Sequence, residues 1–421
     1  MPKFIADFHL HSKYSRATSS DMDIENLSRW AKTKGITLLG TGDFTHPNWV
    51  RELKEKLKPV GNGLYQFSKG EEETYFILTA EVNNIFTKEG KTRRIHNIIF
   101  APSFEVVDKI NYQLGKFGIL TADGRPVLSF FASRLVEMVL DISPECLIVP
   151  AHIWTPHFSL FGANAGFDRI EECFEEQTKN IFALETGLSS DPAMNWRLSA
   201  LDRYSLISNS DAHSPSRIGR EANVFNCQLS YPEIVDVLKK KDKNRFLYTI
   251  EFFPQEGKYH FDGHRNCQTR ISPTEARLNN NLCPACGKKI TVGVMHRLEN
   301  LADREEGIVS SNAIPFKNLI PLEEIIADVL DLGVKTTTVE NEYQKLIKNF
   351  DNEFNVLLEL PQKALASVTS KEIAEGIINV REGKVEILPG YDGEYGKIKI
   401  AREEKAKEIS KEETKGQLKL F

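Results

Sequence analysis

Residues 6–15 read ADFHLHSKYS, and the fold and chemistry of the chain can be argued outward from them. The apolar positions of this stretch predict a short buried β-strand. Side chains two apart on a strand point to the same face, so His9 and His11 present two imidazoles side by side where the strand ends. A buried, hydrogen-bonded histidine is the usual finding, so the pair becomes informative only through the residues that accompany it.

Strand-like and helix-like segments alternate through the first 250 residues. Residues 23–35, DIENLSRWAKTKG, predict a helix with Asp23 as its N-cap and Gly35 as its C-cap. Residues 36–44, ITLLGTGDF, read as a strand, and residues 193–204 read as helical. Repeated βα units predict the α/β class with a parallel sheet or barrel, in which functional residues gather at the carboxyl ends of the strands.

Side chains that bind metals fall at the ends of these predicted strands. They are His9, His11, Asp43, Glu81, His96, His152, Glu185, Asp211 and His213. Imidazoles and carboxylates together suit Zn²⁺, Mn²⁺ or Fe²⁺. A carboxylate that bridges two ions about 3.5–4 Å apart is a recurrent device of phosphoester hydrolysis. Because the strands deliver their ends to one rim, we expect these groups to share a site.

The motifs that carry these residues resemble a known superfamily. They are DFHLHS (7–12), GTGD (40–43), TAE (79–81), RRIH (93–96), PAHIW (150–154) and NSDAH (209–213). As a group they resemble the polymerase-and-histidinol-phosphatase (PHP) superfamily of metal-dependent phosphoesterases. Three further stretches make the whole chain similar to the endonuclease Q family, which are DNA repair nucleases of archaea and some bacteria. They are KYHFDGHRNC (258–267), CPACGKKITVGVMHRLENLADR (283–304) and PGYDGEYGKIKI (389–400).

The resemblance implies four parts. They are a distorted (βα)7 TIM-like PHP barrel at residues 1–250, a zinc-binding module at 251–300, a mainly helical, DNA-contacting C-terminal domain at 301–400 and a charged tail at 401–421. The implied reaction is hydrolysis of the phosphodiester bond 5′ to a deaminated base (hypoxanthine, uracil or xanthine) or an abasic site, by metal-activated water.

The resemblance also implies a ligand set for two or three divalent ions, with zinc expected and manganese or magnesium as alternatives. One ion is held by His9, His11 and Asp211, Glu81 bridges, and the second ion is completed by His96 and His152; Asp43 and His213 serve a third position. The expected catalytic residues are Glu81 and Asp211 of this set, together with Asp191, which is suggested by its own position in the sequence.

Asp191 has two interpretations. It lies in TGLSSDP (186–192), six residues after Glu185, where it would position water or act as an acid or base. Alternatively, it caps a helix that has Pro192 at its first position. The sequence leaves both interpretations open.

Four residues in the second half of the chain form two short-spaced pairs. His264 and Cys267 lie in HRNC, and Cys283 and Cys286 lie in CPAC. Two such pairs around a loop are typical of a structural tetrahedral zinc, with His260 as an alternative fourth ligand. A redox CxxC would need a βαβ context, which is missing. Residues 252–299 hold seven Lys/Arg against four Asp/Glu, so we expect this module to contact DNA phosphates.

The remaining features bear on location and partners. The formal net charge of −5 neither demands nor excludes a nucleic-acid partner. The chain lacks an apolar run of about 18 residues and a leader-like start, which predicts no membrane contact and a cytoplasmic, nucleoid-associated prokaryotic protein. The last residues, KGQLKLF, resemble a shortened motif for the sliding clamp PCNA with Gln417, Leu420 and Phe421 as anchors. A plain solvated tail is the alternative.

Three classes of function compete. The first is a lesion-specific DNA endonuclease. The second is a small-molecule phosphoesterase of the histidinol-phosphatase type, which shares the barrel chemistry but has no need of a zinc module or a helical C-terminal domain. The third is a non-catalytic DNA-binding or clamp-associated protein with a degenerate barrel, and the near-complete ligand set argues against it.

Overall fold

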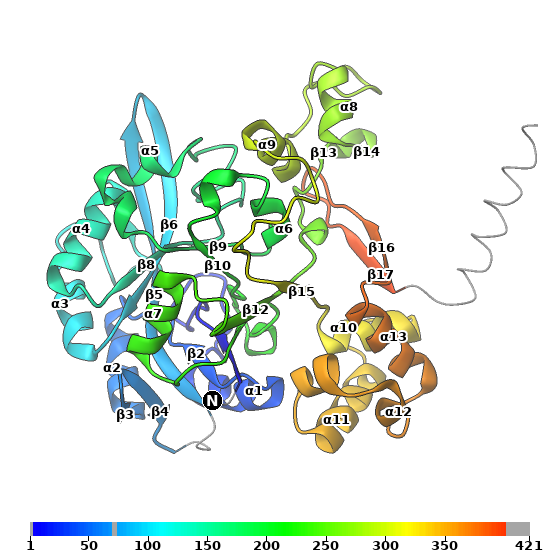
Figure 1. The fold of residues 1–421 in the computed structure, drawn as a ribbon, viewed down its shortest axis with the longest axis horizontal. Helices are drawn as coiled ribbons and strands as arrows, with labels where there is room; N and C mark the ends of the chain where they lie inside the picture. Colours follow the sequence, from blue (N-terminus) through cyan, green and yellow to red (C-terminus); the bar gives the residue numbers. More distant parts are fainter. Residues whose placement is uncertain (1–2, 70–73, 401–421) are drawn as a thin grey trace, which may run out of the picture.

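The computed structural model describes residues 3–69 and 74–400. Its N-terminal part is a mixed α/β unit with the strands inside and helices around them (Figure 1). The strands of the large sheet are β1 (Phe4–Asp7), β2 (Leu38–Gly40), β3 (Leu57–Gly61), β4 (Leu64–Phe67), β5 (Tyr75–Lys88), β6 (Lys91–Ala101), β7 (Val127–Leu128), β8 (Leu147–Pro150), β11 (Ala222–Phe225), β12 (Phe246–Glu251) and β15 (Phe316–Asn318). The predicted α/β class is confirmed.

The sheet mixes parallel and antiparallel pairs. β1 pairs in parallel with β2, and β2 with β5, but β5 turns directly into β6 as a long antiparallel hairpin. Glu89 and Gly90 at its tip have φ values of 52° and 73°, which two-residue hairpin turns require. A hairpin therefore replaces the helix that a regular βα repeat would place between β5 and β6. The seven-unit barrel itself stays a prediction, and below we use the word barrel only as a name for the N-terminal α/β unit, residues 3–69 and 74–251.

The strands curl around one apolar core. A separate parallel pair, β9 (Ala183–Glu185) and β10 (Ser205–Ile207), contributes to it. The core includes Phe4, Ala6, Leu38, Ile77, Ile98, Val149, Ala183, Ile207 and Phe225. Beyond the strand ends, Ile153 N–H donates to Glu185 O at 3.0 Å and Phe8 N–H to Asn209 Oδ1 at 2.9 Å. These bonds tie β8 to β9 and β10 to β1, so the ends of these strands lie around one rim.

Helices cover the outside of this unit. They are α1 (Ile24–Lys34), α2 (Pro47–Lys56), α3 (Phe104–Leu114), α4 (Ala132–Ile142), α5 (Ile170–Phe174), α6 (Pro192–Asn195) and α7 (Tyr231–Lys240). Both predicted caps of α1 are confirmed: Asp23 accepts from Asn26 N–H at 2.9 Å, and Gly35 adopts a left-handed φ of 87°. Glycine has no Cβ and adopts this left-handed conformation at little cost, so the helix ends at Gly35.

The predicted helix at residues 193–204 is wrong. α6 ends at Asn195, and only a short 3₁₀ turn, Ser199–Leu201, follows. Ser199 N–H donates to Asp303 Oδ1 at 2.8 Å, and Asp303 N–H donates to Arg197 O at 3.0 Å. A distant segment therefore takes the backbone groups that a continuous helix would have paired internally.

After β12 the chain builds a small unit at residues 257–301, which we call the cysteine module. It holds β13 (Asp262–His264), β14 (Thr269–Ile271), α8 (Pro273–Leu278) and α9 (Val294–Leu301). The chain returns to the sheet through β15, which pairs in parallel with β12.

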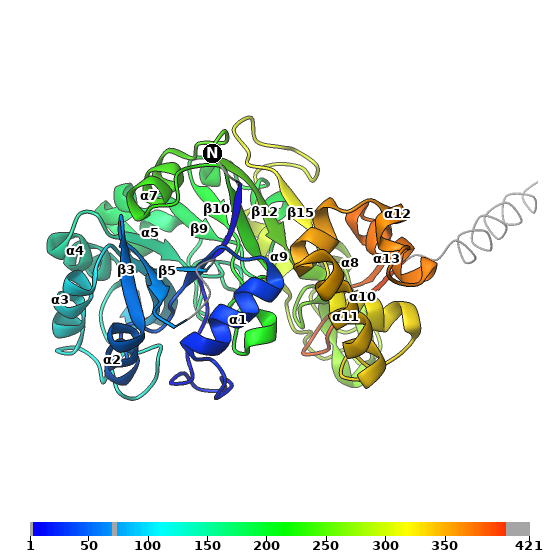
Figure 2. The ribbon, with the colours of Figure 1, turned by 90° about the horizontal axis from the view of Figure 1, so that it is seen from below.

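A helical region follows, on the side of α1 and β15 (Figures 1 and 2). It consists of α10 (Leu322–Leu330), α11 (Thr337–Phe350), α12 (Gln362–Leu365), α13 (Lys371–Arg381) and the hairpin β16 (Val385–Leu388)–β17 (Lys397–Ile400). A buried ion pair, Lys34 Nζ to Glu353 at 2.6 Å, joins it to α1, and Tyr343 donates to the same carboxylate at 2.8 Å.

The loop of the β16–β17 hairpin, residues 389–396, reaches back to the cysteine module. Phe261 N–H donates to Gly390 O at 2.9 Å, and Arg265 N–H donates to Asp392 Oδ2 at 2.6 Å. The module is therefore completed by a segment about 90 residues further along the chain.

Two expectations concern what lies at or beyond the limits of this description. In the part of the chain that the structure describes, every helix is too short or too polar to cross a lipid bilayer. The predicted clamp anchors, Gln417, Leu420 and Phe421, lie outside the described residues.

Candidate metal centre

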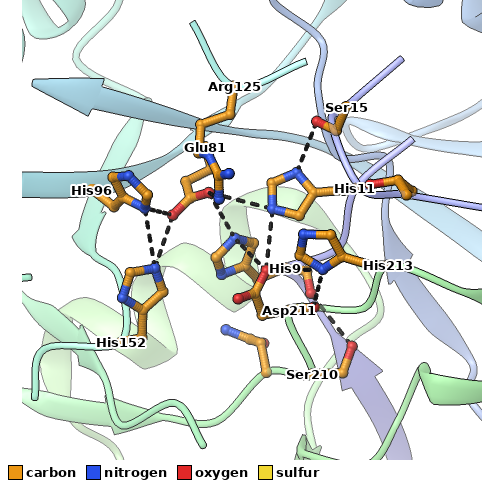
Figure 3. Close-up of polar contacts among 12 residues, drawn as sticks. His9, His11, Ser15, Glu81, His96, Arg125, His152, Ser210, Asp211 and His213 are labelled. Carbon is orange, nitrogen blue, oxygen red and sulfur yellow. Dashed lines mark hydrogen bonds and ion pairs between the residues drawn. The ribbon is translucent and has the colours of Figure 1, made fainter. Parts of the chain in front are cut away.

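Two groups of metal-capable side chains meet at the rim. The first consists of His9 and His11, just past β1, and Asp211, just past β10 (Figure 3). Asp211 Oδ1 lies 3.1 Å from His11 Nε2 and 3.8 Å from His9 Nε2. The second group consists of Glu81 on β5 together with His96 and His152.

Glu81 lies between the two groups. Its Oε1 is 2.6 Å from His96 Nδ1 and 3.0 Å from His152 Nε2. Its Oε2 is 3.3 Å from His11 Nε2 and 3.5 Å from His9 Nε2. The hairpin register explains part of this, because His96 lies opposite Asn83 and therefore on the same face as Glu81. We call these six residues, His9, His11, Glu81, His96, His152 and Asp211, the cage.

A second layer of carboxylates orients the histidines of the first group. His9 Nδ1 lies 3.0 Å from Glu185 Oε1, and His11 Nδ1 lies 3.0 Å from Asp43 Oδ1. These contacts turn both Nε2 atoms toward the centre of the cage, and metal-binding histidines are usually oriented in this way. Glu185 is fixed in turn by the main-chain N–H of His152 at 2.8 Å.

Asp43 was expected at a third ion, and the structure uses its oxygens otherwise. Oδ1 faces His11, while Oδ2 accepts from Ser12 N–H at 2.6 Å, the Ser12 hydroxyl at 2.7 Å and the Ser15 hydroxyl at 3.0 Å. His213 lies beside His11, with ring centroids 4.6 Å apart and the rings tilted by 50°, and its Nδ1 lies 2.8 Å from Asp211 O. The third position stays a prediction.

The backbone is unusual at three of these residues. Asp43, His152 and Asp211 have φ values of 47°, 30° and 46°, a region that residues with a Cβ seldom adopt. Each such residue costs about 1–3 kcal/mol, and this strain collects at functional sites. Gly187 allows the turn at His152, since a Cβ there would collide with the His152 side chain.

Burial and charge act against each other in the cage. Burial disfavours a charged His9, but the surrounding carboxylates, Glu185 first, raise its pKa well above the ordinary value. Burial favours a neutral Glu81, but His96, His9 and Arg125 outweigh it and hold its pKa well below the ordinary value. For His96 burial outweighs the attraction of Glu81 and lowers the pKa of the imidazole to about 4.

Several buried nitrogen and oxygen atoms in the cage, each of a kind that binds metal ions, have no hydrogen-bond partner. Within the described residues these are His9 Nε2, His11 Nε2, His152 Nδ1 and Asp211 Oδ1. Buried polar atoms are rarely left unpaired, because the lost hydration is costly. Three of the four belong to the first group and point at its centre, so the residues present fit a divalent cation there.

Arg125 is a functional candidate that sequence reasoning missed. It donates from Nη1 to Glu81 Oε2 at 3.1 Å (Figure 3). It sits in a loop with no regular pattern, so the sequence carried no local signal for it. Asp191, by contrast, is the N-cap of α6: it accepts from Met194 N–H at 2.9 Å, and burial raises its pKa to about 6. Its catalytic role stays a prediction.

The four residues of the predicted zinc site come together in the cysteine module. The donor atoms of His264, Cys267, Cys283 and Cys286 lie within 4.8 Å of one another. Burial opposes ionisation of Cys283, but hydrogen bonds from Thr269 and from the backbone near Cys286 lower the pKa of its thiol to about 6. His260, the alternative ligand, is instead buried against Phe261.

A cavity of about 640 Å³ separates the barrel from the cysteine module. Its barrel wall is the loop that follows His152, with His157 and Asn164. Its module wall includes Tyr259, Thr291 and Arg297. Arg297 joins the two walls by donating to Phe167 O at 2.8 Å.

Comparisons with known proteins extend over the whole chain. The chain is 30% identical over 420 residues to the uncharacterized protein YqxK of Bacillus subtilis (strain 168), covering 95% of this chain and 100% of the relative. Residues 321–384 match a family described as the MJ0043 C-terminal domain.

Two solved structures resemble the fold closely. The lesion-specific endonuclease PfuEndoQ from Pyrococcus furiosus has a TM-score of 0.85 and 32% identity, over 97% of this chain and 99% of that one. Endonuclease Q in complex with a 27-mer duplex that carries an abasic lesion at its active site has a TM-score of 0.83 and 33% identity, over 96% and 98%.

The α/β fold, the buried imidazole and carboxylate cage and these matches over nearly the whole chain together define a metal-dependent nuclease. Within that class, the chain belongs to the endonuclease Q family.

Proposed function

We propose that the protein is a DNA repair endonuclease that hydrolyses the phosphodiester bond 5′ to a deaminated base (hypoxanthine, uracil or xanthine) or an abasic site. The observation that carries the proposal is the cage, whose buried nitrogen and oxygen atoms are suited to bind metal and lack hydrogen-bond partners. The chain that holds it is similar to endonuclease Q structures over nearly its whole length.

The cage residues are proposed as the ligands of two divalent ions. His9, His11 and Asp211 would hold one, His96 and His152 the other, and Glu81 would bridge them because it faces both groups. When bound, such ions supply an activated water and neutralise charge at the scissile phosphate. Asp43 and His213 remain proposed for a third ion.

The protein's own residues orient the proposed ligands and limit the access of water. Glu185 and Asp43 hold the tautomers of His9 and His11 with each Nε2 free. The rim is buried, so water competes little with the contacts made there. The proposed catalytic carboxylates are Glu81 and Asp211 in the cage, and Asp191 at the start of α6.

The cysteine module and the cavity beside it suit lesion reading. His264, Cys267, Cys283 and Cys286 are proposed to hold a structural zinc. A base turned out of the duplex would enter the cavity, where Tyr259 offers a ring for stacking and Asn164 a polar edge. The surplus of basic residues in the module would contact DNA phosphates.

The test uses 5′-labelled duplexes that carry one deoxyinosine, deoxyuridine or abasic site, with an undamaged duplex as the control. We expect a nick 5′ to the lesion that chelator abolishes and added Zn²⁺, Mn²⁺ or Mg²⁺ restores. Turnover of a sugar phosphate without nicking would favour a small-molecule phosphoesterase, and binding without cutting would favour a non-catalytic DNA-binding protein. Clamp binding through Gln417, Leu420 and Phe421, and a nucleoid-associated cytoplasmic location, stay predictions.

A further inference from the structure

The guanidinium of Arg125 adjoins the cage at Glu81. It contacts the Oε2 edge of Glu81, while the Oε1 edge faces His96 and His152 (Figure 3). The Arg125 side chain keeps 25% of its surface exposed, whereas Glu81 is fully buried. This arginine therefore meets the carboxylate that faces both ligand groups, and part of its side chain stays accessible from solvent.

The loop around Arg125 is held in place at several points. Gly124 N–H donates to Tyr14 O at 3.1 Å, the Thr45 hydroxyl donates to Gly124 O at 2.8 Å, and Asn83 N–H donates to Pro126 O at 3.0 Å. Gly124 packs so closely that a Cβ would collide with the Asp43 carboxylate and the Ser15 hydroxyl. Arg125 is thus positioned by the fold and does not depend on its contact with Glu81 alone.

Other arginines near the metal motifs are used differently. Arg220 donates to Ser210 O at 2.8 Å, and Arg217 pairs with Glu324 in the helical region. Arg93 donates to Gly166 O and stacks on Phe167. These three arginines have structural roles, since they donate to backbone carbonyls or to a carboxylate far from the cage.

The charge of the cage leaves Arg125 able to bind an anion in addition to Glu81. A carboxylate that shares its charge with two cations compensates a neighbouring guanidinium less well. The guanidinium then favours an additional anion, and its planar fork matches phosphate oxygens. In a phosphodiesterase that anion is the scissile phosphate.

We propose that Arg125 binds a non-bridging oxygen of the scissile phosphate and orients it over Glu81. This inference rests on the proposed function, because it assumes metal ions in the cage. Arg125 would then be a binding residue for any phosphate at the cage, independent of the base or lesion that accompanies it.

The test measures inorganic phosphate binding to the Mn²⁺-loaded protein by calorimetry, after excess metal has been removed, with no DNA present. Arg125→Gln should weaken phosphate binding about 10- to 100-fold, the scale of a lost hydrogen bond to a charged group. Arg125→Lys should recover part of that loss, and the matched control Arg134→Gln, an exposed arginine on α4, should change nothing. Metal content is measured for each variant.

Two results would overturn the proposal. One is unchanged phosphate affinity in Arg125→Gln at full metal content. The other is loss of metal from Arg125→Gln with normal phosphate affinity in the fraction that keeps its ions, since Arg125 would then only support Glu81. Because the assay contains no DNA, a failure of lesion cleavage in the wild-type protein leaves this result interpretable.

Discussion

The cage and the cysteine module bring ligands together in opposite ways. The cage draws His9, Glu81, His152 and Asp211 from segments spread over about 200 residues, and all sit on a large apolar core. The cysteine module draws its four ligands from 23 residues, around an apolar cluster of Ile271, Ala276, Cys283 and Ile290.

The two regions differ in what positions their ligands. In the barrel the sheet fixes the ligands and tolerates left-handed backbone at two of them, His152 and Asp211, so the polypeptide fold itself positions the cage. Four buried apolar residues cannot offset the conformational entropy of a segment that long. If the four residues hold the proposed zinc, the module depends on that ion, because in such units the free energy of metal binding is folding free energy.

The largest effect is expected when a cage ligand that the barrel holds in place is replaced. Glu81→Gln should lower lesion nicking by about 10²–10³-fold or more, the scale of a lost electrostatic contact at a reacting group. The barrel should remain folded, because the sheet does not depend on Glu81. Nicking rates, circular dichroism and metal content check this. A Glu81→Gln protein that unfolds would show that the cage carries the fold.

The same change in the cysteine module should act on folding. Cys283→Ser should abolish binding of one zinc and expose residues 262–290 to hydrogen exchange, while β5 and β6 keep their protection. Cys227→Ala, in the barrel core, serves as the control and should keep the zinc. Protection of residues 262–290 that survives in Cys283→Ser would mean that the module folds without its metal.

A smaller effect is expected where the barrel only orients a ligand. Asp43→Asn should weaken metal binding about 10- to 100-fold, because His11 loses the carboxylate that fixes its ring. Glu185→Gln should do the same through His9. Metal titrations measure both, against the exposed Asp21→Asn as a control. Affinities equal to the control would mean that the cage needs no second layer.

The smallest effect is expected at the junction of the two regions. Burial, followed by repulsion from Glu324, raises the pKa of Glu256 to about 8. A raised folded-state pKa means that its contribution to stability is intact below about pH 4.5 and is lost as the pH rises through about 8. Glu256→Gln should therefore raise Tm at pH 9 and leave it unchanged at pH 4, as thermal scans at both values will show. An equal shift at both pH values would contradict this.

Local signals in the sequence predicted much of the fold but little of the long-range detail. The caps at Asp23 and Gly35 act within one turn of their helix, so the residues alone were sufficient. The helix predicted at residues 193–204 failed because Asp303, a hundred residues away, binds its backbone. Arg125 could not be predicted for a related reason: its place depends on contacts of Gly124 and Pro126 with other segments. The metal-capable residues were visible because strand ends converge, whereas the second-layer use of Asp43 depends on side-chain geometry.

The loop at residues 389–396, which completes the cysteine module, has a consequence for how the protein is made. A ribosome releases the barrel first, then the cysteines, and only later the segment that supplies Gly390 and Asp392. The thiols of Cys267, Cys283 and Cys286 thus leave the exit tunnel about 100 residues before their enclosure is finished. With the proposed zinc site, translation rate and zinc supply during that interval would set how many newly made chains mature with an intact module.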